Sequence, residues 1–156
     1  MSIVDWFKFT PPKDKLFSTY ISNFLKEDQH ILEVYGEILE SGCADGLKLD
    51  YDLFAKHWRA IQLQIFFFQM PRILDDKKYT ELSYKLIEAL NDFDKDIWQL
   101  IKRKYNEAQT LGNITGMIEA LNEKPFKNRF DDKLKNNLVS GLQVVEIAMI
   151  DTIKRF

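Results

Sequence analysis

Apolar side chains recur at every third or fourth position through most of the chain, which is the spacing of one face of an α-helix. The first such stripe begins after Thr10, which suits an N-cap, and Pro11, which suits the first helical position. The stripe lapses at Asp28, so the pattern allows either a kink near residues 26–30 or an unbroken helix. In both cases Gly42 is a typical C-terminal stop.

Two long helices are predicted next. The first runs from an N-cap at Asp50 to Pro71, because proline lacks the N–H that a continuing helix needs. The second begins at a cap provided by Asp75 or Asp76 and continues to a break at residues 111–113, whose sequence is Leu-Gly-Asn.

A short helix is expected over residues 115–122, and a final helix begins at Asp131 and runs to the C-terminus. The centre of that last helix, residues 138–150, has apolar side chains on more than one face, which predicts that it is the most buried helix. No stretch alternates in the manner of a β-strand. The sequence therefore predicts an all-α fold, an antiparallel bundle of four main helices plus one short helix.

The length of 156 residues fits a single domain, residues 1–156. Residues 1–10 form a small amphipathic stretch that we interpret as an arm docking on the bundle, on another chain or on a membrane surface. The one cysteine, Cys43, excludes an intrachain disulfide and suits a reducing compartment. The longest apolar run is residues 65–68 and no secretory signal is visible, so we expect a cytoplasmic protein without a transmembrane segment.

Charge is unevenly distributed along the chain. Residues 27–52 contain eight acidic side chains and one basic one, a formal local charge of −7 in a protein whose net charge is −2. Glu33, Glu37 and Glu40 lie at i, i+4 and i+7, so they share one helical face, and like charges at this spacing repel. A solvated helix face has the same pattern, but a concentrated acidic surface also attracts a basic partner. The predicted partner-binding residues are Glu33, Glu37, Glu40, Asp45, Asp50 and Asp52.

The sequence contains few residues of the types that catalytic and metal-binding sites use. The only two histidines, His30 and His57, fall on different predicted helices, so Cys43 with His57 is the one Cys–His pair to consider. Glu27 and His30 form a single Glu-x-x-His, whereas a two-metal carboxylate site in a bundle needs two such motifs. We therefore predict no catalytic residue, no metal ligand and no cofactor.

Two other binding motifs are incomplete. Asp45, Gly46 and Asp52 match three positions of a calcium loop, but Ser41 and Cys43 do not supply its first carboxylates. No glycine-rich phosphate loop is present.

Basic residues gather at positions 102–104 and 124–135, interleaved with Tyr105, Phe126 and Phe130 in the manner of a nucleic-acid surface. Acidic residues dilute both clusters and the sequence pI is 5.7, so nucleic-acid binding is not expected.

The sequence favours a non-enzymatic protein-binding domain whose acidic face docks on or masks a basic partner, as immunity proteins, adaptors or chaperones do. Two alternatives stay open. One is a metal-dependent helical-bundle enzyme that uses His30 or His57 with nearby carboxylates. The other is a self-associating structural module, a homo-oligomer with the Phe-rich second helix and the N-terminal arm at its interface.

Overall fold

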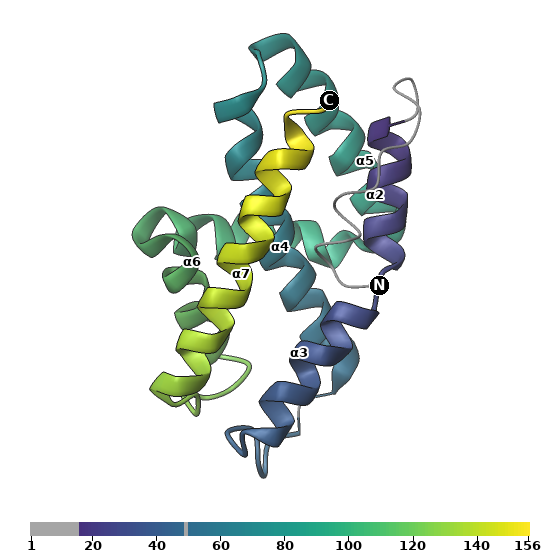
Figure 1. Ribbon diagram of the computed structural model, residues 1–156. Helices are drawn as coiled ribbons and strands as arrows, with labels where there is room; N and C mark the ends of the chain where they lie inside the picture. Colours follow the sequence, from purple (N-terminus) through teal and green to yellow (C-terminus); the bar gives the residue numbers. More distant parts are fainter. Residues whose placement is uncertain (1–15, 49) are drawn as a thin grey trace.

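A computed structural model describes residues 16–48 and 50–156, so the predicted N-terminal arm and the cap at Thr10 lie outside the described residues. Within these ranges every regular element is a helix and none is a strand, which confirms the all-α bundle (Figure 1). The elements are α2 (Leu16–Lys26), α3 (Gln29–Glu40), α4 (Tyr51–Ile73), α5 (Asp76–Leu100), the π-helical turn η2 (Ile101–Tyr105), α6 (Asn106–Glu123) and α7 (Asp132–Ile153).

Helix α4 is the centre of the bundle. It packs against α3, α5, η2, α6 and α7, and Figure 1 shows α7 crossing it with α6 on one side and α5 on the other. Thirteen of its 23 residues are buried, compared with seven of 22 in α7. The prediction that the last helix is the most buried is therefore wrong, because its second apolar face, with Val144 and Ile147, stays exposed to solvent.

The first predicted helix is broken, as the kink interpretation required, and an unbroken helix is wrong. Helix α2 ends at Lys26 and α3 begins at Gln29, whose backbone N–H donates to Glu27 Oε1 over 2.7 Å. That bond gives a partner to one of the amides that any helix start leaves free. After α3, Gly42 has a φ of +77°, which confirms it as the residue that stops the helix.

Three aspartates cap helices through their side chains. Asp50, Asp75 and Asp131 each have extended backbone dihedrals and accept a hydrogen bond from the backbone N–H three residues later. The bonds measure 2.7 to 2.8 Å and their donors are Leu53, Lys78 and Leu134. The helix starts predicted at Asp50, Asp75 and Asp131 are thereby confirmed.

Pro71 does not end α4. The helix continues to Ile73, and the N–H of Leu74 still donates to the Met70 carbonyl over 2.9 Å. Proline this close to a helix end removes one backbone bond, to the carbonyl of Phe67, without disturbing many others.

The third predicted helix contains three irregularities. Asp94 is extended (φ −165°, ψ 103°), η2 interrupts the α-helix, and Gly112 with Asn113 breaks it where the sequence predicted. Asn113 has a φ of +56° and a ψ of −142°, a backbone conformation that residues other than glycine rarely adopt. Beyond this break the backbone approaches itself closely, since a Cβ on Gly116 would lie 2.3 Å from the Ala108 carbonyl oxygen.

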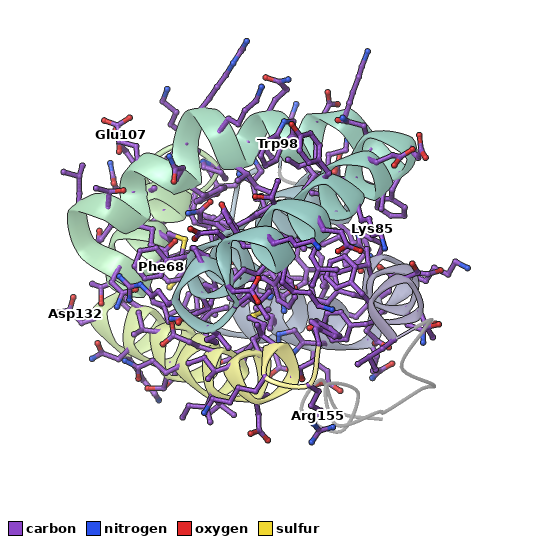
Figure 2. The ribbon with its side chains drawn as sticks, turned by 90° about the horizontal axis from the view of Figure 1, so that it is seen from above. Phe68, Lys85, Trp98, Glu107, Asp132 and Arg155 are labelled. Carbon is purple, nitrogen blue, oxygen red and sulfur yellow. The ribbon has the colours of Figure 1, made fainter. Side chains whose placement is uncertain are left out.

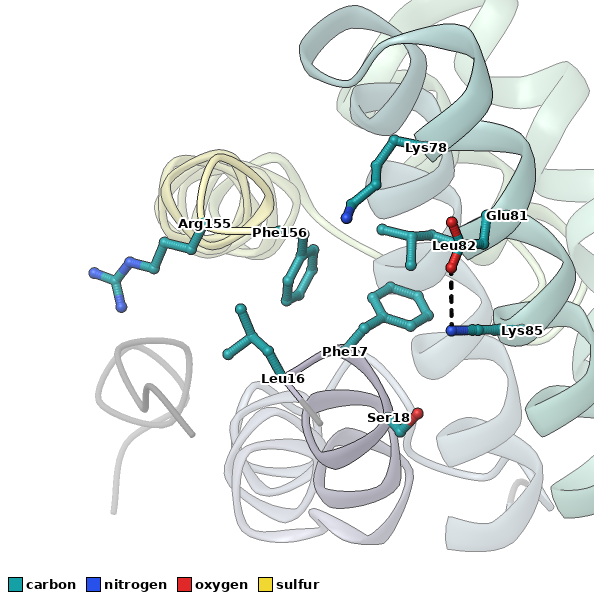
Figure 3. A pocket seen from close by; sticks show the side chains of 9 residues that line it. All are labelled: Leu16, Phe17, Ser18, Lys78, Glu81, Leu82, Lys85, Arg155 and Phe156. Carbon is teal, nitrogen blue, oxygen red and sulfur yellow. Dashed lines mark hydrogen bonds and ion pairs between the residues drawn. The ribbon is translucent and has the colours of Figure 1, made fainter. Parts of the chain in front are cut away.

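The C-terminus completes the core beside the start of α2. Phe156 packs edge-on against Phe17, with ring centroids 5.1 Å apart, and also contacts Tyr20 and Phe66. Next to these rings is a cavity of about 350 Å³, shown in Figure 3, whose charged lining includes the ion pair of Lys85 and Glu81. No described helix combines the length and apolar character needed to cross a bilayer.

Candidate partner-binding surface

The outer side of α3 presents the three glutamates that the sequence placed on one face. Glu33, Glu37 and Glu40 are exposed, while Ile31, Val34 and Ile38 on the opposite side are buried in the core. We call these three glutamates the acidic α3 face. None of them takes part in the ion pairs found among the described residues. Glu33 accepts one hydrogen bond, from Gln29 Nε2 at 3.1 Å.

Two leucines lie on the same exposed side of α3. Leu32 and Leu39 are 49% and 50% exposed, although both are large apolar side chains. They are seven residues apart, so they align along the helix beside the glutamates. The surface therefore combines negative charge with apolar area, a combination that the sequence did not predict.

A shallow groove extends the acidic α3 face toward the start of α7. It has a volume of about 390 Å³ and is lined by Glu37 and Glu40 on one side and by Asp131, Lys133 and Asn137 on the other. Asp131, whose side chain caps α7, thus lies at the edge of this surface.

The other three predicted residues lie outside helix α3. Asp45 belongs to the turn after α3, and its backbone carbonyl accepts a hydrogen bond from Arg129 Nη1 at 2.6 Å. Asp50 is occupied as the N-cap of α4. Asp52 lines a separate groove of about 520 Å³ at the break between α2 and α3. Of the six predicted residues, Glu33, Glu37 and Glu40 share the outer side of α3.

The groove that contains Asp52 is electrostatically balanced. Lys56 Nζ lies 3.3 Å from Asp94 and 3.2 Å from Asp96, and the Arg59 guanidinium pairs with Asp28. Its carboxylates mostly have cations of their own, so they attract an external basic partner less than the acidic α3 face does.

Both histidines have structural partners. His30 Nε2 accepts the indole N–H of Trp58 at 3.3 Å, and His57 Nδ1 shares a hydrogen bond of 2.7 Å with the Tyr105 hydroxyl. Burial lowers the pKa of both imidazoles, and for His57 burial and then the nearby Lys104 lower the pKa to about 4. Both rings are therefore neutral at pH 7.

The catalytic and metal candidates do not come together. The structure forms no hydrogen bond between Cys43 and His57, and the Glu27-x-x-His30 pair turns its imidazole toward Trp58. Across residues 16–48 and 50–156 no group of three or more His, Cys, Asp and Glu side chains is arranged to hold a metal ion.

The aromatic residues between the basic clusters are not available for stacking on bases. Tyr105 and Phe126 are fully buried, and Phe130 is 5% exposed. Two of the nearby cations are also engaged: Lys135 pairs with Glu119 at 3.0 Å, and Arg129 bonds to the turn after α3. This region lacks the exposed rings on which single-stranded nucleic acid stacks.

Comparison of the chain with protein-family models, with curated proteins and with solved structures finds no match.

Proposed function

We propose that the protein is a non-enzymatic binding domain that docks on a basic protein partner through the acidic α3 face. The observation that carries the proposal is that Glu33, Glu37 and Glu40 are exposed together and that none of them forms an ion pair with a cation of the described residues. Uncompensated charges of one sign raise the rate at which an oppositely charged partner associates and determine its orientation.

The neighbouring leucines restrict the kind of partner that fits. Leu32 and Leu39 would remain solvated against a purely ionic partner, whereas an interface core favours apolar contact surrounded by polar groups. A basic segment that also presents apolar side chains, such as an amphipathic helix, satisfies both parts of the surface. Docking of this kind is compatible with an immunity, adaptor or chaperone role.

Binding would also relieve repulsion within α3. Glu33 and Glu37 are at i, i+4, a like-charge spacing that destabilises a helix by about 0.2–0.5 kcal/mol. Lysine or arginine side chains from a partner would convert this repulsion into attraction. The interaction should therefore weaken as salt screens the charges.

The test begins with capture of partners from the native host, followed by titration of the purified partner at several salt concentrations. The triple variant Glu33→Gln, Glu37→Gln and Glu40→Gln keeps the side-chain shapes and removes the charges. We expect it to bind at least about tenfold more weakly and with a smaller salt dependence.

The matched control is Glu88→Gln, Glu107→Gln and Glu123→Gln, three exposed glutamates away from the acidic α3 face. It removes the same net charge and should leave the affinity nearly unchanged. If both triple variants lost the same affinity for the partner, the loss would be due to net charge alone. If the triple variant of the acidic α3 face lost no affinity, the proposal would be contradicted.

The two alternative functions have less support. His30 and His57, which a metal-dependent enzyme would use, are bonded to Trp58 and Tyr105. Phe66, part of the Phe-rich run proposed for self-association, is buried inside the bundle. Elemental analysis of the purified protein tests the first alternative, and light scattering over a range of concentrations tests the second.

A further inference from the structure

A second hollow lies on a different part of the molecule, between the last turns of α4, helix α5 and η2. We call it the α4–η2 groove; its volume is about 610 Å³. Aromatic side chains make up much of its wall, and Phe68 and Trp98 are labelled in Figure 2. The four rings are Phe67, Phe68, Tyr79 and Trp98. A volume in this range with aromatic walls is typical of sites for small molecules.

Every charged residue that lines the α4–η2 groove is basic. The Arg72 guanidinium lies over the Phe68 ring at 3.7 Å from its centroid, and Lys102 Nζ lies 5.6 Å from the centroid of Trp98. Neither cation forms an ion pair with a carboxylate of the described residues. In a protein of net charge −2, these cations are held beside aromatic rings and remain free to pair with an anion.

Polar groups of fixed position complete the lining. Gln64, which is 4% exposed, donates from Nε2 to Asn106 Oδ1 at 3.2 Å and to Gln109 Oε1 at 2.8 Å. Gln64 and Asn106 both line the groove. Their mutual bond holds two amide groups at a surface that is mainly aromatic and cationic, and such groups orient a bound molecule.

Two of the helical segments that line the α4–η2 groove depart from regular α-helix. On the α4 side, Pro71 has no N–H to donate to the Phe67 carbonyl. On the opposite side, the π-helical turn η2 contributes Lys102, and its last residue, Tyr105, is fixed by the 2.7 Å bond to His57. Single π-helical turns inside α-helices occur frequently at functional sites.

We propose that the α4–η2 groove binds a small molecule that has a flat aromatic ring and an anionic group. The ring packs on the aromatic wall formed by Phe68 and Trp98, and the anion pairs with Arg72 and Lys102. Aromatic carboxylates and mononucleotides share this chemistry, since each joins a planar ring to a carboxylate or a phosphate. The site is separate from the acidic α3 face. The α4–η2 groove would bind an anion, whereas the acidic α3 face would bind a basic partner.

The experiment is isothermal titration calorimetry of the full chain with four probes. Naphthalene-2-carboxylate and AMP carry the anion, and naphthalene-2-carboxamide and adenosine are their uncharged counterparts. We expect at least one anionic probe to bind about tenfold more tightly than its neutral counterpart, because a charge-assisted pair exceeds a neutral contact. Binding of the carboxylate alone identifies aromatic acids as the ligand class, and binding of AMP alone identifies nucleotides.

The double variant Arg72→Gln and Lys102→Gln should lower the affinity for the anionic probe about tenfold and leave the neutral probe unchanged. Its matched control is Lys95→Gln and Lys154→Gln, two exposed lysines outside the groove. Circular dichroism verifies that each variant is folded. The proposal is overturned if neither anionic probe binds with a Kd below about 1 mM, if neutral and charged probes bind equally, or if the control variant loses as much affinity.

Discussion

The Arg59 guanidinium of α4 donates a hydrogen bond to Asp28 Oδ1 at the break between α2 and α3. The donor atom is Arg59 Nη2, which also lies 3.3 Å from the Glu27 carbonyl oxygen. One side chain therefore contacts both Glu27 and Asp28, the two residues between α2 and α3. Arg59 is 9% exposed at its side chain and Asp28 is 54% exposed. The buried Arg59 guanidinium is thus paired with the carboxylate of Asp28, the residue at which the first apolar stripe of the sequence is interrupted.

Substitution Asp28→Asn should lower the free energy of unfolding by about 1–2 kcal/mol, because Arg59 stays buried and loses its charged partner. The Arg59→Met substitution removes the cation as well, so the double variant should lose less than the two single variants added together. Urea denaturation of the four proteins measures this coupling. Asp92→Asn, at an exposed position of α5, is the control for general charge effects. Strictly additive losses would show that the pair contributes nothing.

His57 should make stability depend on pH. Its pKa is lowered to about 4 by burial and by Lys104, whereas an unfolded histidine titrates near pH 6.5. As the pH falls through this window the unfolded chain takes up the proton first, so the native state loses stability. The loss is absent above about pH 6.5, and it reaches on the order of 2 kcal/mol near pH 4 after allowance for solvent screening.

The comparison that isolates this effect is with His57→Gln, which can still hydrogen-bond to the Tyr105 hydroxyl but does not titrate. Urea denaturation at intervals from about pH 8 to about pH 4 should give two curves that converge as the pH falls, because the variant lacks the histidine penalty. Other acidic groups and His30 titrate in both proteins and cancel. Parallel curves would mean that His57 is as easily protonated in the folded protein as in the unfolded one.

Local chemistry made much of the fold predictable. The caps at Asp50, Asp75 and Asp131 depend on residues three positions apart, and the break at Gly112 and Asn113 depends on the backbone freedom of those two residues. The central position of α4 was not predictable in this way. Several of its buried polar side chains bond to partners far away in the sequence, as in the bond from Arg59 to Asp28 or from Gln64 to Gln109.

The candidate surfaces also differ in how far the sequence could predict them. Helical spacing alone placed the glutamates of the acidic α3 face together. Spacing could not show that Leu32 and Leu39 stay exposed, because residues at the edge of an apolar stripe are covered only if a neighbouring helix reaches them. The α4–η2 groove depends on the packing of α4 against α5, which brings Phe67 and Trp98 to 5.3 Å between ring centroids.

Asp50 should act as a helix cap rather than as a partner-binding charge. Substitution Asp50→Ala removes the acceptor for the Leu53 N–H and should lower the free energy of unfolding by about 1 kcal/mol. Asp50→Asn removes the charge but keeps a good cap, so its stability should stay within a few tenths of a kcal/mol of the parent protein.

Thermal and urea denaturation measure the stability of both Asp50 variants, and titration with the captured partner measures their affinity. A folded Asp50→Asn variant should bind the partner almost as well as the parent protein, in contrast to the triple glutamine variant of the acidic α3 face. A large loss of affinity in Asp50→Asn would show that the charge of Asp50 contributes to partner binding, as the sequence predicted.

Two glycines should respond to alanine in opposite directions. A Cβ at Gly116 would lie 2.3 Å from the Ala108 carbonyl oxygen, a backbone atom that cannot move aside alone, so Gly116→Ala should lose about 2 kcal/mol or more. Gly141 lies exposed in α7 with no atom within 4 Å of the added carbon. Gly141→Ala should therefore gain about 0.5–1 kcal/mol from reduced backbone entropy in the unfolded chain.

Urea denaturation of both alanine variants gives the sign and size of each change, and each serves as the control for the other because the chemical substitution is identical. Stabilisation in both would mean that the chain does not fold back on itself at Gly112 and Asn113 as closely as the 2.3 Å approach requires. Destabilisation in both would mean that α7 packs its outer side, including Gly141, against a surface of another molecule. Opposite signs are expected because the cost of a side chain depends on the space around it, while its benefit to a helix does not.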